Sequence, residues 1–148
     1  MKLQVKPLSE KIGNEIPLPY YATEGAAAMD LHACIDEPMT IPPGGRILVP
    51  TGLAVAIPEG YVGIVAVRSS MGIKNGVTLS NGIGVIDSDY RGPLGVGLMN
   101  TAAAPYEVRP GDRIAQLMVL PVVRPTLEVV EELPETVRGQ GGIGSTGR

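Results

Sequence analysis

The sequence has no phenylalanine, no tryptophan and a single cysteine among its 148 residues, and five tyrosines are its only large aromatic side chains. Any stacking against a flat ligand must therefore use a tyrosine. Cys34 has no partner for an internal disulfide, and its place in an apolar, strand-like run favours a buried structural thiol. With one histidine and one cysteine, the chain also lacks the ligand cluster that binds a transition metal.

Long apolar runs and excess positive charge are absent as well. No stretch has the ~20 apolar residues of a membrane-spanning helix, and no signal peptide is recognisable. The formal net charge is −3, whereas non-specific binding to nucleic acid needs a basic surface. We therefore expect a reducing, cytoplasmic setting, with neither a membrane nor a nucleic acid as partner. A phosphorylated small molecule held by a few arginines is compatible with this composition.

Glycine and proline are plentiful, with 20 and 14 residues, and they form turn signals such as Pro42–Gly45 and Pro58–Gly60. Only residues 69–76 could form a helical turn, since no stretch has sustained helical periodicity. Short strands joined by Pro-Gly turns are typical of an all-β sandwich or barrel, here as one domain over residues 1–137. Apolar runs of strand length occur at 2–6, 26–35, 46–49, 53–57, 61–67, 94–99 and 113–123.

Residues Asn81–Gly92, with the sequence NGIGVIDSDYRG, form the most distinctive stretch. Together with the apolar run that begins at Leu94, they predict a β-hairpin whose bend carries two carboxylates, a tyrosine and an arginine between Asp87 and Arg91. Rigid strands would hold such a cluster in place for chemistry. A solvated turn with Asx hydrogen bonds explains the same residues without any function.

The C-terminal segment Arg138–Arg148 is rich in glycine and carries two hydroxyl side chains. One interpretation is a disordered terminus, which is common at chain ends. The other is a phosphate cradle, since glycine frees backbone N–H groups to face an oxyanion, and Ser145 and Thr146 add donors. The segment is not a P-loop, because no lysine precedes Ser145.

Five segments form an ordered set: Ala27–Leu31, Arg68–Gly72, Asn81–Gly92, Pro110–Gln116 and Arg138–Gly147. In order and spacing they resemble the trimeric dUTP diphosphatase (dUTPase) family. The resemblance implies a jelly-roll-like subunit with a flexible glycine-rich tail at 138–148, a homotrimer, and active sites at subunit interfaces. It also implies Mg²⁺-assisted hydrolysis of dUTP to dUMP and pyrophosphate.

The resemblance implies that the Asn81–Gly92 segment forms the part of the site where the reaction takes place. Asp87 matches the carboxylate that activates water for in-line attack at the α-phosphorus. Tyr90 matches the aromatic residue packed against the deoxyribose, where its ring leaves no space for a 2′-hydroxyl. A uracil slot would leave the polar groups of cytosine unpaired. The resemblance places this slot at Asn81, Val85, Ile86 and Gly95.

Other matched residues are expected to bind the phosphate chain. Arg68, Ser69 and Ser70 match a phosphate-gripping segment, although Ser70 stands where the family commonly has glycine. Gln116 matches a glutamine of the phosphate and water network, and Asp30 is expected to support either the metal-water or the arginine network. Mg²⁺ would be held mostly by the triphosphate and its waters.

The tail supplies the remaining contacts that the resemblance implies. Arg138 matches the arginine that binds the γ-phosphate. Ile143 departs from the family, which usually has a phenylalanine stacked over uracil, so the lid over the base must be aliphatic or come from a tyrosine elsewhere. Additional phosphate donors are expected from Gly144, Ser145 and Thr146.

Two other functions stay open. A dCTP deaminase or bifunctional enzyme on the same fold is favoured by the pair Ser69-Ser70 and opposed by Asp87 and the glycine-rich tail. A trimeric regulatory protein without turnover is opposed by four residues that are present together: Asp87, Arg68, Gln116 and Arg138. Release of ammonia from dCTP or of pyrophosphate from dUTP would discriminate among the three.

Overall fold

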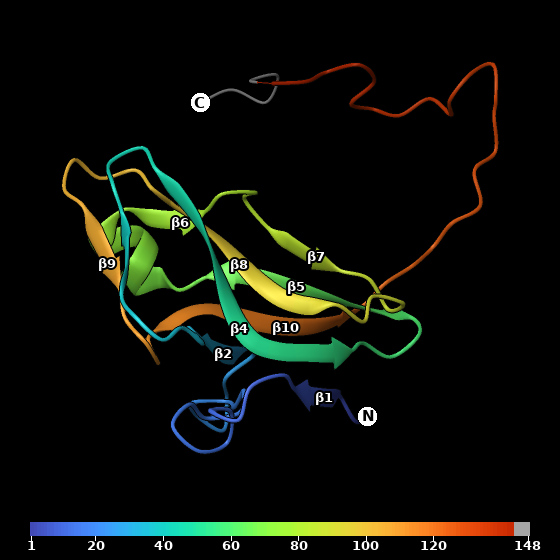
Figure 1. The fold of residues 1–148 in the computed structure, drawn as a ribbon. Coiled ribbons are helices and arrows are strands. Elements are labelled where there is room, and N and C mark those ends of the chain that lie inside the picture. The colour runs from blue at the N-terminus through green and yellow to red at the C-terminus, as the bar shows by residue number, and fades with distance from the viewer. Residues whose placement is uncertain (144–148) are drawn as a thin grey trace.

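Ten β-strands build the part of the chain that the computed structural model describes, residues 1–143. Two four-stranded sheets and one two-stranded sheet contain them, and every strand pair is antiparallel. The first sheet has the order β1 (Gln4–Pro7), β4 (Arg46–Ala56), β8 (Pro93–Asn100), β6 (Val77–Leu79). The second has the order β2 (Met29–His32), β10 (Arg113–Pro121), β5 (Tyr61–Val67), β7 (Gly84–Ile86), and β3 (Met39–Ile41) pairs with β9 (Tyr106–Val108) (Figure 1).

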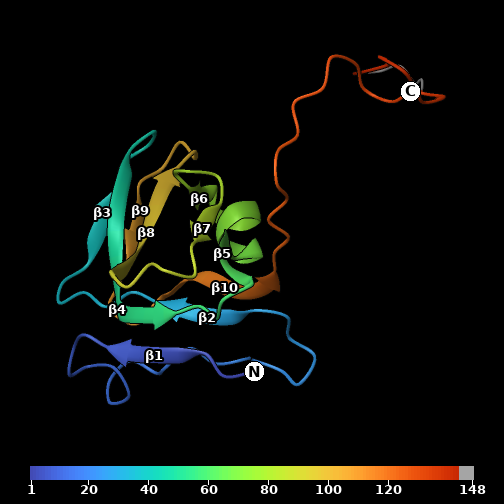
Figure 2. The same cartoon turned by 90° about the vertical axis from the view of Figure 1, so that its right-hand side faces the viewer.

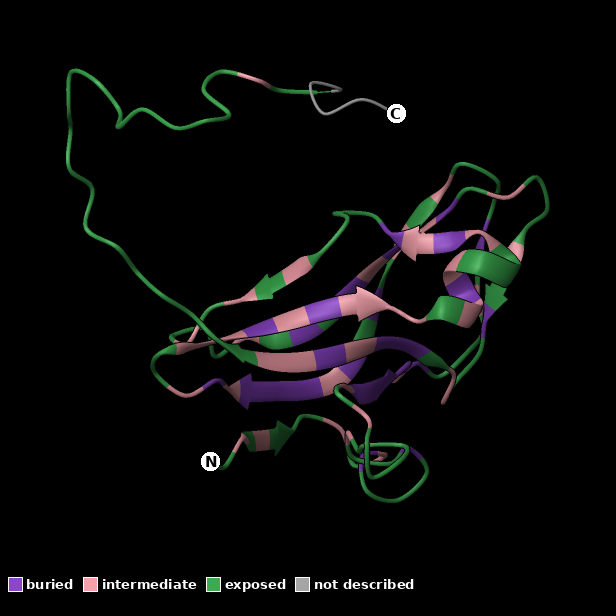
Figure 3. Cartoon of the chain, turned by 180° about the vertical axis from the view of Figure 1, so that it is seen from behind, coloured by how far each residue is buried: buried purple, intermediate pink, exposed green. Residues whose placement is uncertain are grey.

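The core lies between the two large sheets, because alternate residues of their strands are apolar. Val96 and Leu98 of β8 are buried, and they share one apolar cluster with Leu31 of β2 and Leu117 of β10. Full burial of one such leucine contributes about 1.5–3 kcal/mol. Figure 3 shows the buried residues concentrated on the strands. The prediction of an all-β, jelly-roll-like fold is confirmed.

The prediction of separate strands at 46–49 and 53–57 is wrong, since both belong to β4. The Pro50–Gly52 segment is an irregularity inside this strand, where the pairing with β8 shifts register between Pro50 and Ala54. Proline removes one ladder donor, and Gly52 adopts φ 70°, a conformation that favours glycine. A Cβ at Gly52 would lie 2.6 Å from Sγ of the half-buried Cys34, so the bulge also needs glycine for space.

The prediction of a β-hairpin around Asp87 is also wrong. β7 pairs with β5 in the second sheet, whereas β8 pairs with β4 and β6 in the first. Residues 87–92, here called the Asp87 loop, therefore connect the two sheets (Figure 1). The alternation of apolar residues is the same for a hairpin and for strands that face each other across a core, so the local pattern does not separate the two.

A short π-helix, η1 (Ser70–Lys74), follows β5 and agrees with the single helical turn expected at 69–76. It lies next to β6 (Figure 2). After β10 the backbone N–H of Val122 still donates to the carbonyl of Gly60 at 2.9 Å. From there the described chain runs exposed and away from the strands (Figures 1 and 3). Within residues 1–143, no helix has the length and apolar character needed to span a bilayer.

Candidate active site

An acid-arginine cluster around a buried aspartate lies at one end of the second sheet. Asp30 of β2, whose side chain is 2% exposed, pairs through Oδ1 with Arg68 Nε at 3.3 Å and through Oδ2 with Arg113 Nη1 at 3.2 Å. Gln116 Nε2 also donates to Asp30 Oδ1, at 3.2 Å. Both carboxylate oxygens are thus engaged, which offsets the cost of burying the charge. Two guanidinium groups against one carboxylate leave the cluster, named here the Asp30 cluster, with an excess positive charge.

The register of the strands in the second sheet brings the residues of this cluster together. Gln116 of β10 lies opposite Asp30 on one side and Ala66 of β5 on the other, and Arg68 follows directly after β5. The neighbours of Gln116 on β10, Ala115 and Leu117, are fully buried in the core, as predicted. The side chain of Gln116 therefore points to the opposite face, because successive side chains of a strand alternate.

Arg113 is the member of the cluster that the sequence did not suggest. In a regular strand, Arg113 and Gln116 are an odd number of residues apart and point to opposite faces. The pairing of β10 with β2 shifts register between Arg113 and Ala115, and this bulge brings both side chains to Asp30. Arg113 lies inside the matched Pro110–Gln116 segment, and this position was the only feature of the sequence that could have indicated a role at the site.

His32, on the same strand as Asp30, and Tyr20 of the preceding segment lie beside each other. Their rings stack, with centroids 6.1 Å apart and planes 22° from parallel. Burial lowers the pKa of His32 below its usual value, Arg113 and Arg68 lower it further, and Asp30 opposes them. The imidazole is therefore neutral at pH 7, so it adds no charge to the cluster. Burial also raises the pKa of Tyr106 on β9.

The three residues matched to the phosphate-gripping segment follow directly after the end of β5. Arg68 is a member of the Asp30 cluster, and its carbonyl accepts hydrogen bonds from the N–H groups of Met71 at 3.0 Å and Gly72 at 3.1 Å. Ser69 precedes η1 and is exposed, and Ser70 is the first residue of η1. These bonds hold the backbone of the segment beside the cluster.

The Asp87 loop is held by hydrogen bonds among its own residues. The N–H of Tyr90 donates to the carbonyl of Asp87 at 3.2 Å. Arg91 Nη1 donates to the carbonyls of Ser88 at 2.7 Å and Tyr90 at 2.8 Å, and Tyr90 Oη donates to the carbonyl of Pro93 at 3.0 Å. The carboxylate of Asp87 accepts none of these bonds and lies exposed at the surface.

A small cleft of about 150 Å³ opens beside this loop, between the start of β8 and β7. It brings together Asp87, Tyr90 and the three residues predicted for the uracil slot by backbone position, Val85, Ile86 and Gly95. Pro93 and Leu94 complete its lining. Asn81 does not line it: this residue is exposed at the other end of β7, where its carbonyl accepts a bond from the N–H of Ile83 at 2.8 Å.

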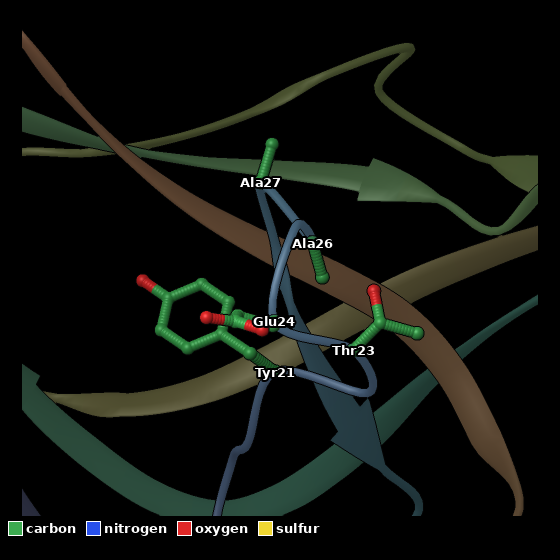
Figure 4. Close-up of a pocket in the computed structure, with 5 residues that line it drawn as sticks. All are labelled: Tyr21, Thr23, Glu24, Ala26 and Ala27. Atoms are coloured by element: carbon green, nitrogen blue, oxygen red, sulfur yellow. The ribbon is translucent and has the colours of Figure 1, made fainter.

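Two wider hollows border these regions. One of about 780 Å³ also borders the Asp87 loop and is lined in part by Asp89, Arg91 and Arg124. The other, of about 480 Å³, is formed by the segment that leads into β2, and Figure 4 shows its lining residues Tyr21, Thr23, Glu24, Ala26 and Ala27. It carries one carboxylate and no basic side chain, so it is unsuited to an anion.

The Asp30 cluster and the Asp87 loop lie far apart in one chain. Ile86, the last residue of β7, pairs with Gly63, which precedes Arg68 by five residues on β5. At about 3.3 Å per residue, the strand separates the Asp87 end of β7 from Arg68 by about 17 Å. The predicted site residues therefore form two groups, which the fold of one chain does not join.

The predicted tail residues join neither group within the described chain. Arg138 is exposed, and its Nε donates to the carbonyl of Gly141 at 2.9 Å. Ile143 is exposed as well. Gly144, Ser145 and Thr146 lie outside the described residues.

The fold and the two groups define a β-sandwich protein with arginines for an anion and, on a separate loop, a carboxylate beside a narrow cleft. Comparison with known proteins gives the family: the family model described as dUTPase matches residues 14–147, and the chain belongs to the dUTPase family. It is 49% identical over 148 residues to the deoxyuridine 5′-triphosphate nucleotidohydrolase of Idiomarina loihiensis, covering 99% of this chain and 98% of that protein. The same figures hold for the enzyme of Pasteurella multocida.

Solved structures of phage dUTPases have the same fold. The dUTPase of Staphylococcus bacteriophage 80alpha, solved as a mutant with dUpNHpp, superposes with a TM-score of 0.88 at 28% identity over 99% of both chains. A mutant dUTPase from phage phi11 of S. aureus, described with a structural Mg(II) ion, has a TM-score of 0.78 at 29% identity. It covers 89% of this chain and 98% of its own.

Proposed function

We propose that this protein hydrolyses dUTP to dUMP and pyrophosphate. The observation that carries the proposal is the cleft beside the Asp87 loop. There one exposed carboxylate, one tyrosine and the backbone positions of a uracil slot converge in a chain of the dUTPase family. The product dUMP supplies thymidylate synthesis, and removal of dUTP keeps uracil out of DNA.

Asp87 is the general base of the proposed reaction. Its carboxylate accepts a proton from a water molecule while the water oxygen forms a bond to the α-phosphorus. The bond from that phosphorus to the bridging oxygen breaks, and pyrophosphate leaves with the electron pair. The hydrogen bonds within the Asp87 loop hold the backbone, and the carboxylate stays free for the water.

The Asp30 cluster binds the phosphate chain in this proposal. Arg68 and Gln116 are fixed by Asp30 before substrate arrives, so little side-chain entropy is lost on binding. Three side chains bind the oxygens of Asp30, which supports a role in orienting the arginines. The excess positive charge of the cluster suits a triphosphate.

Mg²⁺ fits the residues present. Within residues 1–143, no group of three or more His, Cys, Asp or Glu side chains is placed to hold a metal. Mg²⁺ keeps several waters and is commonly bound by substrate phosphates with one or two carboxylates, so this donor set suits an ion that arrives with the triphosphate. When bound, the ion neutralises charge on the phosphate oxygens.

A homotrimer completes the site in this proposal. The separation of about 17 Å between the two groups in one chain supports a site in which the Asp87 loop of one chain faces the Asp30 cluster of another. The extended segment after β10 exposes Leu127, Val129 and Leu133, apolar side chains that a neighbouring copy would cover. Arg138, Ile143 and the following residues would then close over the triphosphate from a further chain, with Ile143 as an aliphatic lid.

A cytoplasmic setting of the protein also remains a prediction.

The decisive experiment is an assay of the purified protein with dUTP and Mg²⁺. Release of one pyrophosphate per dUMP supports the proposal. Release of ammonia from dCTP would instead identify a deaminase on the same fold. Binding of dUTP without any product would point to a regulatory protein and overturn the proposal. Light scattering on the same sample tests the trimer, which a fully active monomer would exclude.

A further inference from the structure

Gly92 closes the Asp87 loop, and its lack of a side chain makes room for the ring of Tyr90. A Cβ at Gly92 would overlap Oη of Tyr90 and lie 2.6 Å from its Cζ and 3.0 Å from its Cε2. Real Cβ atoms do not approach other atoms this closely, so one of the two residues would have to move. The backbone of Gly92 is not in the left-handed region. Space, and not conformational freedom, is therefore what requires glycine here.

The same space seats the tyrosine ring against the backbone. Tyr90 Oη reaches across Gly92 to the carbonyl of Pro93 at 3.0 Å. In this position the ring lines the small cleft together with Asp87 and Val85. Tyr90 is 42% exposed, so the fold of one chain does not enclose its ring. A ring displaced from Gly92 therefore has room to leave its place in the lining of the cleft.

We propose that Gly92 is a specificity-determining residue, which positions Tyr90 so that its ring closes the space beside C2′ of the bound sugar. This inference rests on the proposed function, in which Tyr90 packs against deoxyribose. A methyl group at position 92 breaks the bond from Tyr90 Oη to Pro93 and moves the ring outward. The space that opens then admits the 2′-hydroxyl of a ribonucleotide.

The effect on the reacting carboxylate is expected to be smaller. Asp87 is tied to the loop through the N–H of Tyr90, and Arg91 bonds the backbone of Ser88 and Tyr90 independently of the tyrosine ring. Gly92→Ala should therefore lower the ratio of kcat/KM for dUTP to that for UTP by roughly 10-fold to 100-fold, the usual range for steric rejection of one hydroxyl. The kcat for dUTP should fall by less than about fivefold.

A double-mutant cycle with Tyr90→Ala separates positioning from a structural role. Without the ring there is nothing for the new methyl group to displace. Gly92→Ala should therefore leave the dUTP:UTP ratio unchanged in the Tyr90→Ala background. A purely structural role of Gly92 would lower activity equally in both backgrounds and would overturn the proposal.

The matched control is Gly25→Ala. Gly25 also has an ordinary backbone conformation, and nothing lies within 4 Å of a Cβ built there. This variant should keep both kcat/KM values. If Gly92→Ala alone fails to fold, folding should return in the double variant, and failure of both would contradict the proposed overlap.

The outcomes distinguish this inference from the proposed function. No pyrophosphate release from dUTP by the wild-type protein would overturn the proposed function and the inference with it. Wild-type turnover with unchanged rejection of UTP in a folded Gly92→Ala trimer would overturn the inference alone. A crystal structure of this variant should show Tyr90 Oη withdrawn from the carbonyl of Pro93.

Discussion

The two ends of strand β5 border acidic side chains in opposite physical situations. At the end next to Arg68, Asp30 is buried, and both of its oxygens are bound by side chains that come from other segments of the second sheet. At the end next to β7, Asp87 is exposed on a loop that is held by hydrogen bonds among neighbouring residues. One carboxylate is engaged in the fold, and the other is free for a ligand.

In the proposed function, this contrast separates the binding of phosphate from the reaction. A carboxylate that organises two arginines must be fixed before the substrate arrives, and long-range pairing in a sheet provides that rigidity. A general base needs an unoccupied lone pair and room for water, which a surface loop provides. Mutation of Asp30 is therefore expected to lower the unfolding free energy, whereas mutation of Asp87 is expected to lower the turnover of dUTP.

The largest expected effect comes from Asp87→Asn. The amide keeps the shape of the side chain but does not accept the proton, so turnover of dUTP should fall by roughly 10²–10⁴ while the substrate still binds. Steady-state kinetics and equilibrium binding of a non-hydrolysable dUTP analogue measure the two quantities. Asp89→Asn is the matched control, and a comparable loss there would assign the base to Asp89.

Asp30→Asn tests the structural side of the contrast. It removes the charge that both arginines share, and because Arg68 and Arg113 are partly exposed to solvent, the loss should be about 1–3 kcal/mol of unfolding free energy. Urea denaturation should show this loss for Asp30→Asn. The exposed Asp87→Asn should stay within about 0.5 kcal/mol of wild type. Equal stability of the two variants would refute the division of roles.

Deletion of residues 138–148 tests the third part of the proposed site. The described portion of this tail makes its hydrogen bonds within 136–141. The deletion should therefore leave the trimer and its unfolding free energy unchanged while turnover falls at least ~10-fold, since closure over the substrate is lost. Ile143→Gly should also weaken the binding of dUTP, but by less than the deletion does. Unchanged turnover after deletion would remove the tail from the mechanism.

The smallest expected effect is a pH dependence that originates at His32. The pKa of His32 is lowered in the fold, so the unfolded chain binds this proton more readily, and the contribution to stability is complete above about pH 6.5. It is lost as the pH falls through the lower pKa of the folded state. Unfolding free energies of wild type and His32→Asn, measured from pH 7.5 to 5, should converge on acidification. Parallel curves would contradict a buried neutral imidazole.

The grouping of part of the candidate site could be predicted because its residues are close in sequence. Asp87, Tyr90 and the backbone at Val85 and Ile86 lie within six positions, and they line one cleft in the structure as expected. Ala115 and Leu117 alternate with Gln116 in sequence and in burial, so the face of β10 was also predictable. Residues that are close in the sequence therefore also lie close together in this part of the structure.

What the sequence determined by itself is the all-β class and the positions of most strands, because both depend on short-range alternation and turn chemistry. Only the tertiary structure decided that β4 is continuous through Pro50, that β7 and β8 belong to different sheets, and that a bulge turns Arg113 toward Asp30. The choice of a strand's partner depends on the packing of the whole core, since a given apolar pattern satisfies several pairings equally well. The same long-range packing places about 17 Å of β5 between the two acidic groups, which no local pattern encodes.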